Sequence, residues 1–217
     1  MDAIVISDLH LGSRYVQLEH VLRFFRTLPD AVPLILNGDI VDRVHHPLPD
    51  QHAPVLDLIR DESLRRQVVW VYGNHDDGYQ LDDPGGIEFC RSFRLGQRLF
   101  VSHGYDFDNV MTRYQPFVKM FNKLHKFRLW LGAEPVHVAQ YAKQWALCYQ
   151  YLRRSVMASA IAYARANGFA AITCGHTHFA EDLTVDGIRY INTGAWTELP
   201  AYFLAVHDDS MELHKVE

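Results

Sequence analysis

The chain has 217 residues, of which 48% are hydrophobic and 22% charged, and its formal net charge at pH 7 is −5. This composition is typical of a globular protein, and the length predicts one domain over residues 1–217. The acidic balance disfavours nucleic acid as a partner, and no apolar run in the sequence is long enough to span a bilayer.

The cysteines and the N-terminus favour a cytoplasmic protein. Three cysteines, odd in number and unclustered, are predicted to be reduced and buried thiols rather than a disulfide framework or a zinc site: Cys90, Cys148 and Cys174. Met1 leads directly into an apolar run, without the basic head and apolar segment of a targeting signal.

The first predicted strand covers residues 3–7 and ends at Asp8-Leu9-His10. Asp8 and His10 are two residues apart, so their carboxylate and imidazole fall on one side of an extended backbone. We interpret the pair as candidate metal ligands rather than a solvated loop. A helix with apolar residues at helical spacing is expected to open at Gly12 and to end near Pro29.

The second predicted strand covers residues 31–36 and is followed by Gly38 and Asp39. Glycine allows a sharp turn there, which would aim the Asp39 carboxylate into the same site. For Asp42 the pattern leaves two roles open, a surface or helix-capping residue and a carboxylate that supports the site. Three histidines in the proline-rich stretch that follows are predicted to be exposed loop residues: His45, His46 and His52.

The third predicted strand, residues 67–72, leads into Gly73-Asn74-His75-Asp76. Asn74 offers a neutral oxygen to a metal ion. His75 can protonate a leaving group, and Asp76 beside it is expected to orient the ring. These four residues alone are a weak pattern, which gains weight from its place among the other strand ends.

Two histidine-bearing strand ends follow later in the chain. Strands of a second sheet are expected at residues 87–93 and 97–101, and the latter delivers His103. The apolar run 169–174 ends in Gly175-His176-Thr177-His178, where two imidazoles are separated by one residue. Neutral histidines are ligands that borderline divalent ions prefer.

The segment between these two histidine motifs carries a helical insertion, about residues 107–167. Residues 107–165 contain nine Lys or Arg and two acidic residues, a net charge of +7 that leaves −12 for the rest of the chain. One helix is expected from Pro116 to Gly132, and a longer one from about 136 to 167. The apolar face of the first contains Phe117, Phe121, Leu124, Phe127 and Leu131.

Three interpretations of the insertion remain open. It is a hairpin packed on the sheet with a solvated basic face, a surface for a phosphate-bearing amphiphile, or a nucleic-acid surface that combines basic and aromatic residues. The amphiphile interpretation takes four basic residues as candidate substrate contacts: Lys119, Lys123, Arg153 and Arg154.

Four short strands are expected after the histidine pair, over residues 181–185, 188–192, 202–207 and 211–216, and the last is predicted to close the second sheet. The residues Asn192-Thr193-Gly194 are predicted to form a turn. His207 and His214 have no partners in the sequence pattern and are predicted to lie at the surface.

The five motifs together resemble those of the calcineurin-like metallophosphoesterases: D-x-H, G-D, G-N-H-D/E, a histidine before glycine, and G-H-x-H. The resemblance implies an α/β fold, a four-layer αββα sandwich of two mixed sheets, with two divalent ions at the strand ends. It assigns Asp8, His10 and His178 to one ion, Asn74, His103 and His176 to the other, and Asp39 as the bridge, with His75 as general acid or transition-state stabiliser. Such mixed ligands suit Mn²⁺, with Fe or Zn²⁺ as alternatives.

Within that family, the insertion and the segments 4–13 and 190–198 resemble the bacterial UDP-2,3-diacylglucosamine pyrophosphatase group. This resemblance implies a Mn²⁺-dependent hydrolase at the inner face of the inner membrane, releasing UMP and a diacylglucosamine 1-phosphate, with the insertion as a lid. The best-known members of the group carry Arg at the position of His75. That difference keeps a broader phosphodiesterase or nuclease as an alternative, beside a non-catalytic metal-binding scaffold. The oligomeric state is left open.

Overall fold

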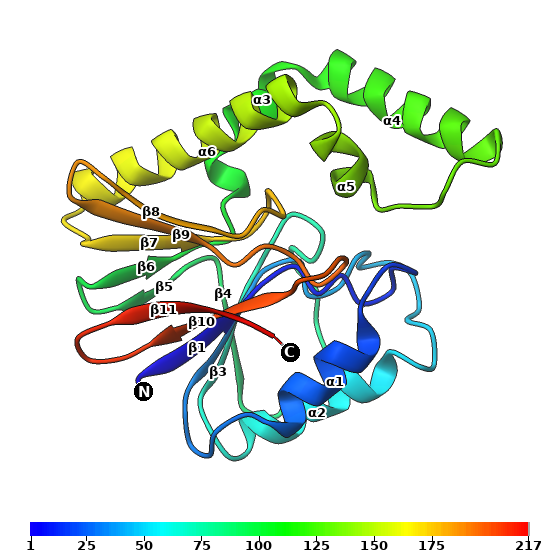
Figure 1. Cartoon of the computed structure of the whole chain (residues 1–217). Helices are drawn as coiled ribbons and strands as arrows, with labels where there is room; N and C mark the ends of the chain where they lie inside the picture. The colour runs from blue at the N-terminus through cyan, green and yellow to red at the C-terminus, as the bar shows by residue number, and fades with distance from the viewer. Residues whose placement is uncertain (217) are drawn as a thin grey trace.

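The computed structural model describes residues 1–216, without the side chains of Thr112 and Phe117, so the predicted place of Phe117 on an apolar helix face lies outside the described residues. Two mixed β-sheets pack face to face, and helices cover their outer faces (Figure 1). This is the predicted four-layer α/β sandwich. A helical insertion extends from one end of it.

The first sheet has six strands. Four consecutive strands, β1 to β4, run parallel to one another, and β4 is at the edge. Its outer face is covered by α1 (Leu18–Arg26) and α2 (Ala53–Ser63), which pack on Ile4 and Ile6. In order across the sheet, the strands are β11 (Met211–Lys215), β10 (Tyr202–Val206), β1 (Ala3–Ile6), β2 (Leu34–Asn37), β3 (Val68–Val71) and β4 (Ile87–Cys90).

The second sheet has five strands, and its outer face is covered by α6 (Ala146–Ala166). Ala160 and Ala164 of that helix pack against Ile172 of the sheet, because small residues let the helix approach closely. In order, the strands are β5 (Phe93–Leu95), β6 (Leu99–Val101), β7 (Ala171–Cys174), β9 (Ile188–Asn192) and β8 (Glu181–Val185).

Apolar residues on both sides of the central strands hold the layers together. Val5 and Val69 of the first sheet face Val101 and Ala171 of the second, while alternate residues such as Ile4 face the helices. Successive side chains of a strand point to opposite faces, so a strand that is buried on both sides reads as a continuous apolar run. The runs predicted from the sequence have this origin.

The insertion comprises α6 and, before it, a short turn of 3-10 helix and three further helices. These are η1 (Tyr105–Phe107), α3 (Asn109–Arg113), α4 (Gln115–Trp130) and α5 (Val138–Lys143), and α4 and α5 project beyond the second sheet (Figure 1). Ten of the thirteen exposed large hydrophobic side chains among the described residues lie here: Met111, Tyr114, Met120, Leu124, Phe127, Trp130, Leu131, Trp145, Leu147 and Tyr151. No helix in the described part of the chain is long and apolar enough to cross a membrane.

The sheet assignment of two predicted strands was wrong. β4 was expected in the second sheet but pairs in parallel with β3 of the first. β11 was expected to close the second sheet but pairs with β10, which joins β1 in the first. A period of two identifies a strand without identifying its neighbour, since pairing depends on contacts distant in sequence.

Two predicted helix boundaries were also wrong. The helix expected from Gly12 begins only at Leu18, because Gly12 has φ of 100° and Ser13 Oγ accepts the N–H of Tyr15 in a turn. The long helix expected over residues 136–167 is divided into α5 and α6 at Trp145, whose ring packs on Phe121 of α4. This tertiary contact has no local sequence signal.

Several single-residue predictions need correction. Cys148 is exposed and Cys90 half-buried, so only Cys174 is a buried free thiol as expected. His45 and His46 are exposed as predicted, but His52 is buried because its Nδ1 accepts the backbone N–H of Gly12. The side chain of His214 is 44% exposed, as predicted for a surface residue, whereas His207 is half-buried.

Candidate metal centre

The predicted ligands meet at one edge of the sandwich. Each follows the carboxyl end of a parallel strand, from β1, β2 and β3 of the first sheet and from β6 and β7 of the second. Functional groups of α/β proteins gather at this edge. The first two loops are joined by backbone hydrogen bonds, from Asp8 N–H to Gly38 O and from His10 N–H to Asp39 O, both at 2.9 Å.

The backbone is strained where the site is formed. Seven non-glycine residues in the described chain have positive φ, and five of them are predicted ligands: Asp8 (54°), His10 (52°), Asp39 (54°), His176 (61°) and His178 (54°). A left-handed conformation is unfavourable for residues with a side chain and clusters at functional sites, where the surroundings hold it in place.

Two glycines are required because ligands lie against them. A Cβ on Gly73 would be 2.2 Å from Asp39 Oδ1, and a Cβ on Gly175 would be 2.1 Å from Asp8 Oδ2. No side chain fits at such distances. The glycines of these motifs therefore make room for carboxylates from neighbouring strands.

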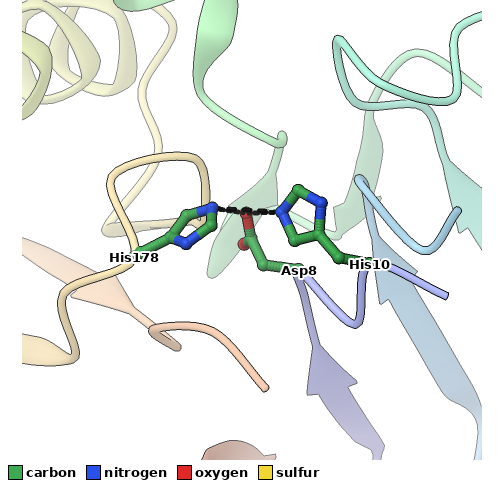
Figure 2. A group of neighbouring side chains, drawn as sticks. All are labelled: Asp8, His10 and His178. Atoms are coloured by element: carbon green, nitrogen blue, oxygen red, sulfur yellow. Dashed lines mark hydrogen bonds and ion pairs between the residues drawn. The ribbon is translucent and has the colours of Figure 1, made fainter. Parts of the chain in front are cut away.

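The first group of ligand atoms comes from Asp8, His10 and His178. Figure 2 shows the two rings facing the Asp8 carboxylate from opposite sides. Nε2 of His178 lies 3.2 Å from Asp8 Oδ1 and 3.1 Å from Nε2 of His10. Their ligand atoms all lie within 4.8 Å of one another, a spacing that fits one cation.

The second group lies beside it. Nε2 of His103 is 3.2 Å from Asp39 Oδ2, and the same oxygen is 3.8 Å from Nε2 of His10 in the first group. The ring of His176 lies 5.5 Å from that of His103, and its Nδ1 is 3.0 Å from Asn74 Oδ1. All seven predicted ligands are therefore neighbours in space.

Hydrogen bonds on the far side of three rings direct lone pairs into this centre. Nδ1 of His10 pairs with Asp42 Oδ1 at 3.0 Å, and Nδ1 of His103 with the carbonyl of Asn37 at 3.0 Å. Nε2 of His176 pairs with Asp108 Oδ2 at 2.9 Å. Each ring donates from that nitrogen, so its other nitrogen keeps a lone pair.

Those lone pairs face other hydrogen-bond acceptors. Acceptors that face one another repel unless a cation binds between them. His103 Nε2 is buried and has no hydrogen-bond partner, and it faces a carboxylate. His10 Nε2 faces the ring nitrogen of His178. The donor set of carboxylates, imidazoles and one amide therefore fits two divalent cations of the Mn²⁺, Fe or Zn²⁺ type.

The site concentrates negative charge that attracts cations. Burial acts to lower the pKa of His10, but hydrogen bonds to Asp42 and Asp8 and the charge of Asp39 outweigh it and raise the pKa to about 10. At His103 burial also acts to lower the pKa, but the charges of Asp39 and Asp8 outweigh it and raise the pKa to about 9. Without metal, protons occupy the place of the cations.

Metal binding should therefore release protons. His10 and His103 are protonated below their pKa values of about 10 and about 9 in the metal-free protein, and they must be neutral to bind metal. Because the metal-free form binds more protons, we expect metal affinity to rise with pH up to about pH 10, with release of roughly two protons at pH 7. Calorimetry of Mn²⁺ binding in buffers of different ionisation enthalpy measures the number, and zero release would contradict the ligand assignment.

His75 lies at the open side of the centre, with its side chain 39% exposed. Its Nδ1 is 2.9 Å from the backbone carbonyl of Asp42 and donates to it, so Nε2 is the nitrogen left for the substrate. The prediction that Asp76 orients this ring is wrong. Asp76 is buried and accepts from the backbone N–H groups of Ile40 and Gly73, and from the indole of Trp70.

Asp76 therefore braces the loops that carry the ligands. Its Oδ2 accepts from Ile40 N–H at 2.7 Å and its Oδ1 from Gly73 N–H at 2.6 Å, which ties the β2 loop to the β3 loop. Asn192 has a similar role, since its Nδ2 donates to the carbonyl of Gly175 at 2.7 Å. Asn192 and the Thr193 hydroxyl, 2.7 Å from that of Ser7, link the turn after β9 to two ligand loops.

A cavity of about 700 Å³ opens beside His75, between the ligand loops and the insertion. Arg14 and Arg43 line it from the loops, and Lys126 lines it from α4. Apolar groups such as Leu48 and Leu129 line the rest. The cavity can therefore take an anionic group and an apolar one.

The predicted substrate contacts lie in different surroundings. Lys119 and Lys123 are exposed on α4, and Arg154 is exposed on α6. Arg153 is engaged within the protein, because its guanidinium lies 3.3 Å from the centre of the Phe179 ring and 2.6 Å from Glu181 Oε2.

The structure identifies three residues that support the ligand histidines and that the sequence did not assign to this role. Asp42, whose role the sequence left open, holds His10. Asp108, a buried residue of the insertion, holds His176 and also caps α3 by accepting Met111 N–H at 2.8 Å. His137 of the insertion stacks on His178, and burial followed by the charges of His178 and His10 lowers its pKa to about 3. Only Asp108 had a local signal, as an acidic residue before a helix.

The sequence profile of a family described as calcineurin-like phosphoesterase matches residues 1–180. No curated protein sequence matches the chain. Among solved structures, an archaeal phosphodiesterase is similar at 15% identity and a TM-score of 0.49, with 99% of each chain covered. YfcE, a phosphoesterase from E. coli, is similar at 16% identity and a TM-score of 0.47, with 100% of each chain covered. Vacuolar protein sorting 29 from Cryptosporidium parvum is similar at 12% identity and a TM-score of 0.49, over 98% of this chain and 95% of that one.

Proposed function

Because the chain belongs to the calcineurin-like phosphoesterase family, a family of metal-dependent phosphoester hydrolases, we propose that its centre cleaves a phosphodiester or pyrophosphate bond of a lipid-linked or nucleotide-linked substrate. The observation that carries the proposal is the convergence of seven ligands from five strand ends on one edge of the sandwich. Beside them lies a cavity with basic and apolar walls.

The residues divide the chemical work among them. Two divalent ions bound by such ligands supply an activated water and neutralise charge on the phosphoryl oxygens. Asp39 and the histidines hold the ligand geometry through the hydrogen bonds described above. His75 lines the cavity with Nδ1 fixed on the Asp42 carbonyl and Nε2 4.0 Å from Asp39 Oδ2, so the imidazolium form of the ring can give its Nε2 proton to the leaving oxygen.

For the substrate we propose an acylated nucleotide sugar such as UDP-2,3-diacylglucosamine, and Mn²⁺ as the metal. The support is the insertion, whose net charge is +7 and which exposes large apolar side chains such as Trp130 (78%) and Leu147 (83%). Apolar patches of this kind mark interaction surfaces. Basic residues among them suit an anionic membrane surface, where each contributes about 1 kcal/mol. The enzyme would then act at the cytoplasmic face of a membrane.

A broader phosphodiesterase activity, including nuclease activity, is the second candidate. The observation that favours it is His75 itself, an exposed imidazole at the position where the acyl-sugar group carries Arg. A non-catalytic scaffold is disfavoured, since all seven ligand positions are occupied by residues whose side chains can bind a metal ion. The two enzymatic candidates differ in their dependence on acyl chains.

Turnover of matched substrates distinguishes them. We expect the Mn²⁺-loaded protein to prefer UDP-2,3-diacylglucosamine over the deacylated UDP-sugar by several orders of magnitude in kcat/KM, since each buried methylene contributes about 0.8 kcal/mol. Assays with and without Mn²⁺ on both substrates and on bis-nitrophenyl phosphate measure this. Equal turnover of the acylated and deacylated substrates would leave the broad phosphodiesterase.

Sedimentation with anionic vesicles provides a second readout in the same experiment. The parent protein should bind the vesicles, and a variant with Lys119 and Lys123 changed to Glu should bind them more weakly. Both lysines are exposed on α4 and neither lines the cavity, so the variant should fold and retain bis-nitrophenyl phosphate turnover. Absence of vesicle binding by the parent protein would remove the membrane part of the proposal.

A further inference from the structure

One histidine of the insertion lies against the metal centre. His137, the residue before α5, stacks on His178 with ring centroids 5.2 Å apart and planes 15° from parallel. Its centroid is 5.3 Å from that of His10 and 5.7 Å from that of Tyr15. Contacts with three rings from two other segments therefore fix the position of a side chain that the two-sheet core does not supply.

The hydrogen bond at Nδ1 decides what the ring of His137 can do. The backbone N–H of Ala139 donates to this nitrogen at 3.3 Å, in the first turn of α5. A neutral imidazole that accepts at Nδ1 carries its proton at Nε2. His137 therefore presents an N–H donor rather than the lone pair that a metal ligand needs.

The ring of His137 lies between the metal centre and the cavity. One of its nitrogens is within 4.8 Å of a ring nitrogen of His10 and a carboxylate oxygen of Asp42, and the residue lines the same cavity as His75. A phosphate bound to two ions keeps oxygens that face away from them. Hydrogen bonds to such charged oxygens are short and strong.

We propose that the Nε2–H of His137 donates a hydrogen bond to a phosphoryl oxygen of the substrate, so that the insertion completes the phosphate site. The proposal rests on the proposed phosphohydrolase function. It assigns the insertion a direct contact with the group that reacts, in addition to any role in recognising the rest of the substrate. The contact exists only while α5 lies over the centre, which couples phosphate binding to the position of the insertion.

Two substitutions separate the donor from the stacked ring. His137→Phe keeps a flat aromatic ring on His178 but removes the N–H, whereas His137→Gln removes the ring but restores an N–H donor. The matched control is His214→Phe, which changes another stacked histidine, 5.2 Å from the Phe203 ring on the opposite part of the fold. The readouts are bound Mn²⁺ per chain, calorimetric affinity of the Mn²⁺-loaded protein for inorganic phosphate, and KM and kcat on bis-nitrophenyl phosphate.

We expect His137→Phe to retain its metal and to bind phosphate about 10- to 100-fold more weakly, the loss typical of a hydrogen bond to a charged group. His137→Gln should recover most of the affinity, and His214→Phe should match the parent. Unchanged phosphate affinity in His137→Phe would overturn the proposal. Loss of a metal ion in that variant would also overturn it, because it would show that His137 is a metal ligand and not a hydrogen-bond donor. Phosphate binding does not need turnover, so a parent that binds phosphate but cleaves no ester refutes the proposed function and leaves this comparison intact.

Discussion

The Asp39→Asn variant is expected to lose phosphoester hydrolysis and to bind fewer than two metal ions per chain. Oδ1 of Asp39 accepts the backbone N–H of His75 at 2.8 Å, which fixes the carboxylate. Oδ2 is then left between His103 Nε2, at 3.2 Å, and His10 Nε2, at 3.8 Å. Since these two histidines are assigned to different ions, Oδ2 has the position expected of a bridging oxygen.

An amide cannot take over this role in the same geometry. The oxygen of Asn must face the His75 N–H, because an amide NH₂ there would oppose another donor. The NH₂ group would then occupy the place of Oδ2 and direct hydrogens at His103 and at the cations. The loss of bridging charge between two cations should reduce kcat by roughly 10³-fold or more, since the ions generate the nucleophile.

Metal analysis and turnover of bis-nitrophenyl phosphate test this prediction together. The matched control is Asp182→Asn on β8, an exposed carboxylate that pairs with Arg189 at 2.7 Å. Loss of such a surface pair costs about 0–1 kcal/mol and should change neither readout. Full metal occupancy with normal turnover in Asp39→Asn would show that Asp39 is not a bridging ligand.

The strands and the ligand loops could be predicted from the sequence because their signals are local. β1 lies at residues 3–6 where a strand was expected at 3–7, and Gly38 and Gly175 mark turns next to ligands. A strand buried on both faces is a short apolar run, and its end is marked by glycine and polar residues. The order of the motifs then indicated a shared site.

Sheet membership could not be read in the same way. β4 and β11 have the composition of strands, but their neighbours are β3 and β10 through pairings that no local pattern encodes. Both were expected in the second sheet and both extend the first. A strand's pattern reports burial on its two faces, which is similar in the two sheets of a sandwich.

The residues that support the site from outside its motifs were missed for a related reason. Asp108 and His137 belong to the insertion, and they reach His176 and His178 through the folding of helices across the strand ends. Asp76 was assigned to the ring next to it in sequence, but its partners are the backbone of Ile40 and Gly73. Adjacent residues after a strand point in different directions, so sequence proximity did not predict contact.

His75 is the residue whose substitution should separate leaving-group chemistry from metal binding. Its backbone N–H donates to Asp39 and its Nδ1 donates to the Asp42 carbonyl, so hydrogen bonds orient the residue, and its side chain is not among the seven assigned ligands. In a His75→Ala variant the backbone N–H remains, and the bridging carboxylate keeps its partner. We therefore expect full metal occupancy and a loss confined to the chemical step.

The size of that loss should depend on the leaving group. An alkoxide or sugar oxygen needs a proton as it departs, and general acid catalysis contributes about 10² to 10⁴ in rate, whereas nitrophenolate leaves readily as an anion. His75→Ala should lose activity in this range on an alkyl or sugar phosphodiester and far less on bis-nitrophenyl phosphate, when kcat is compared at saturating substrate. Equal losses on both substrates would instead indicate that His75 stabilises charge on the phosphoryl oxygens. His75→Arg decides between the roles, because Arg supplies positive charge but no transferable proton, and it should restore the alkyl-ester rate only if charge is what His75 contributes.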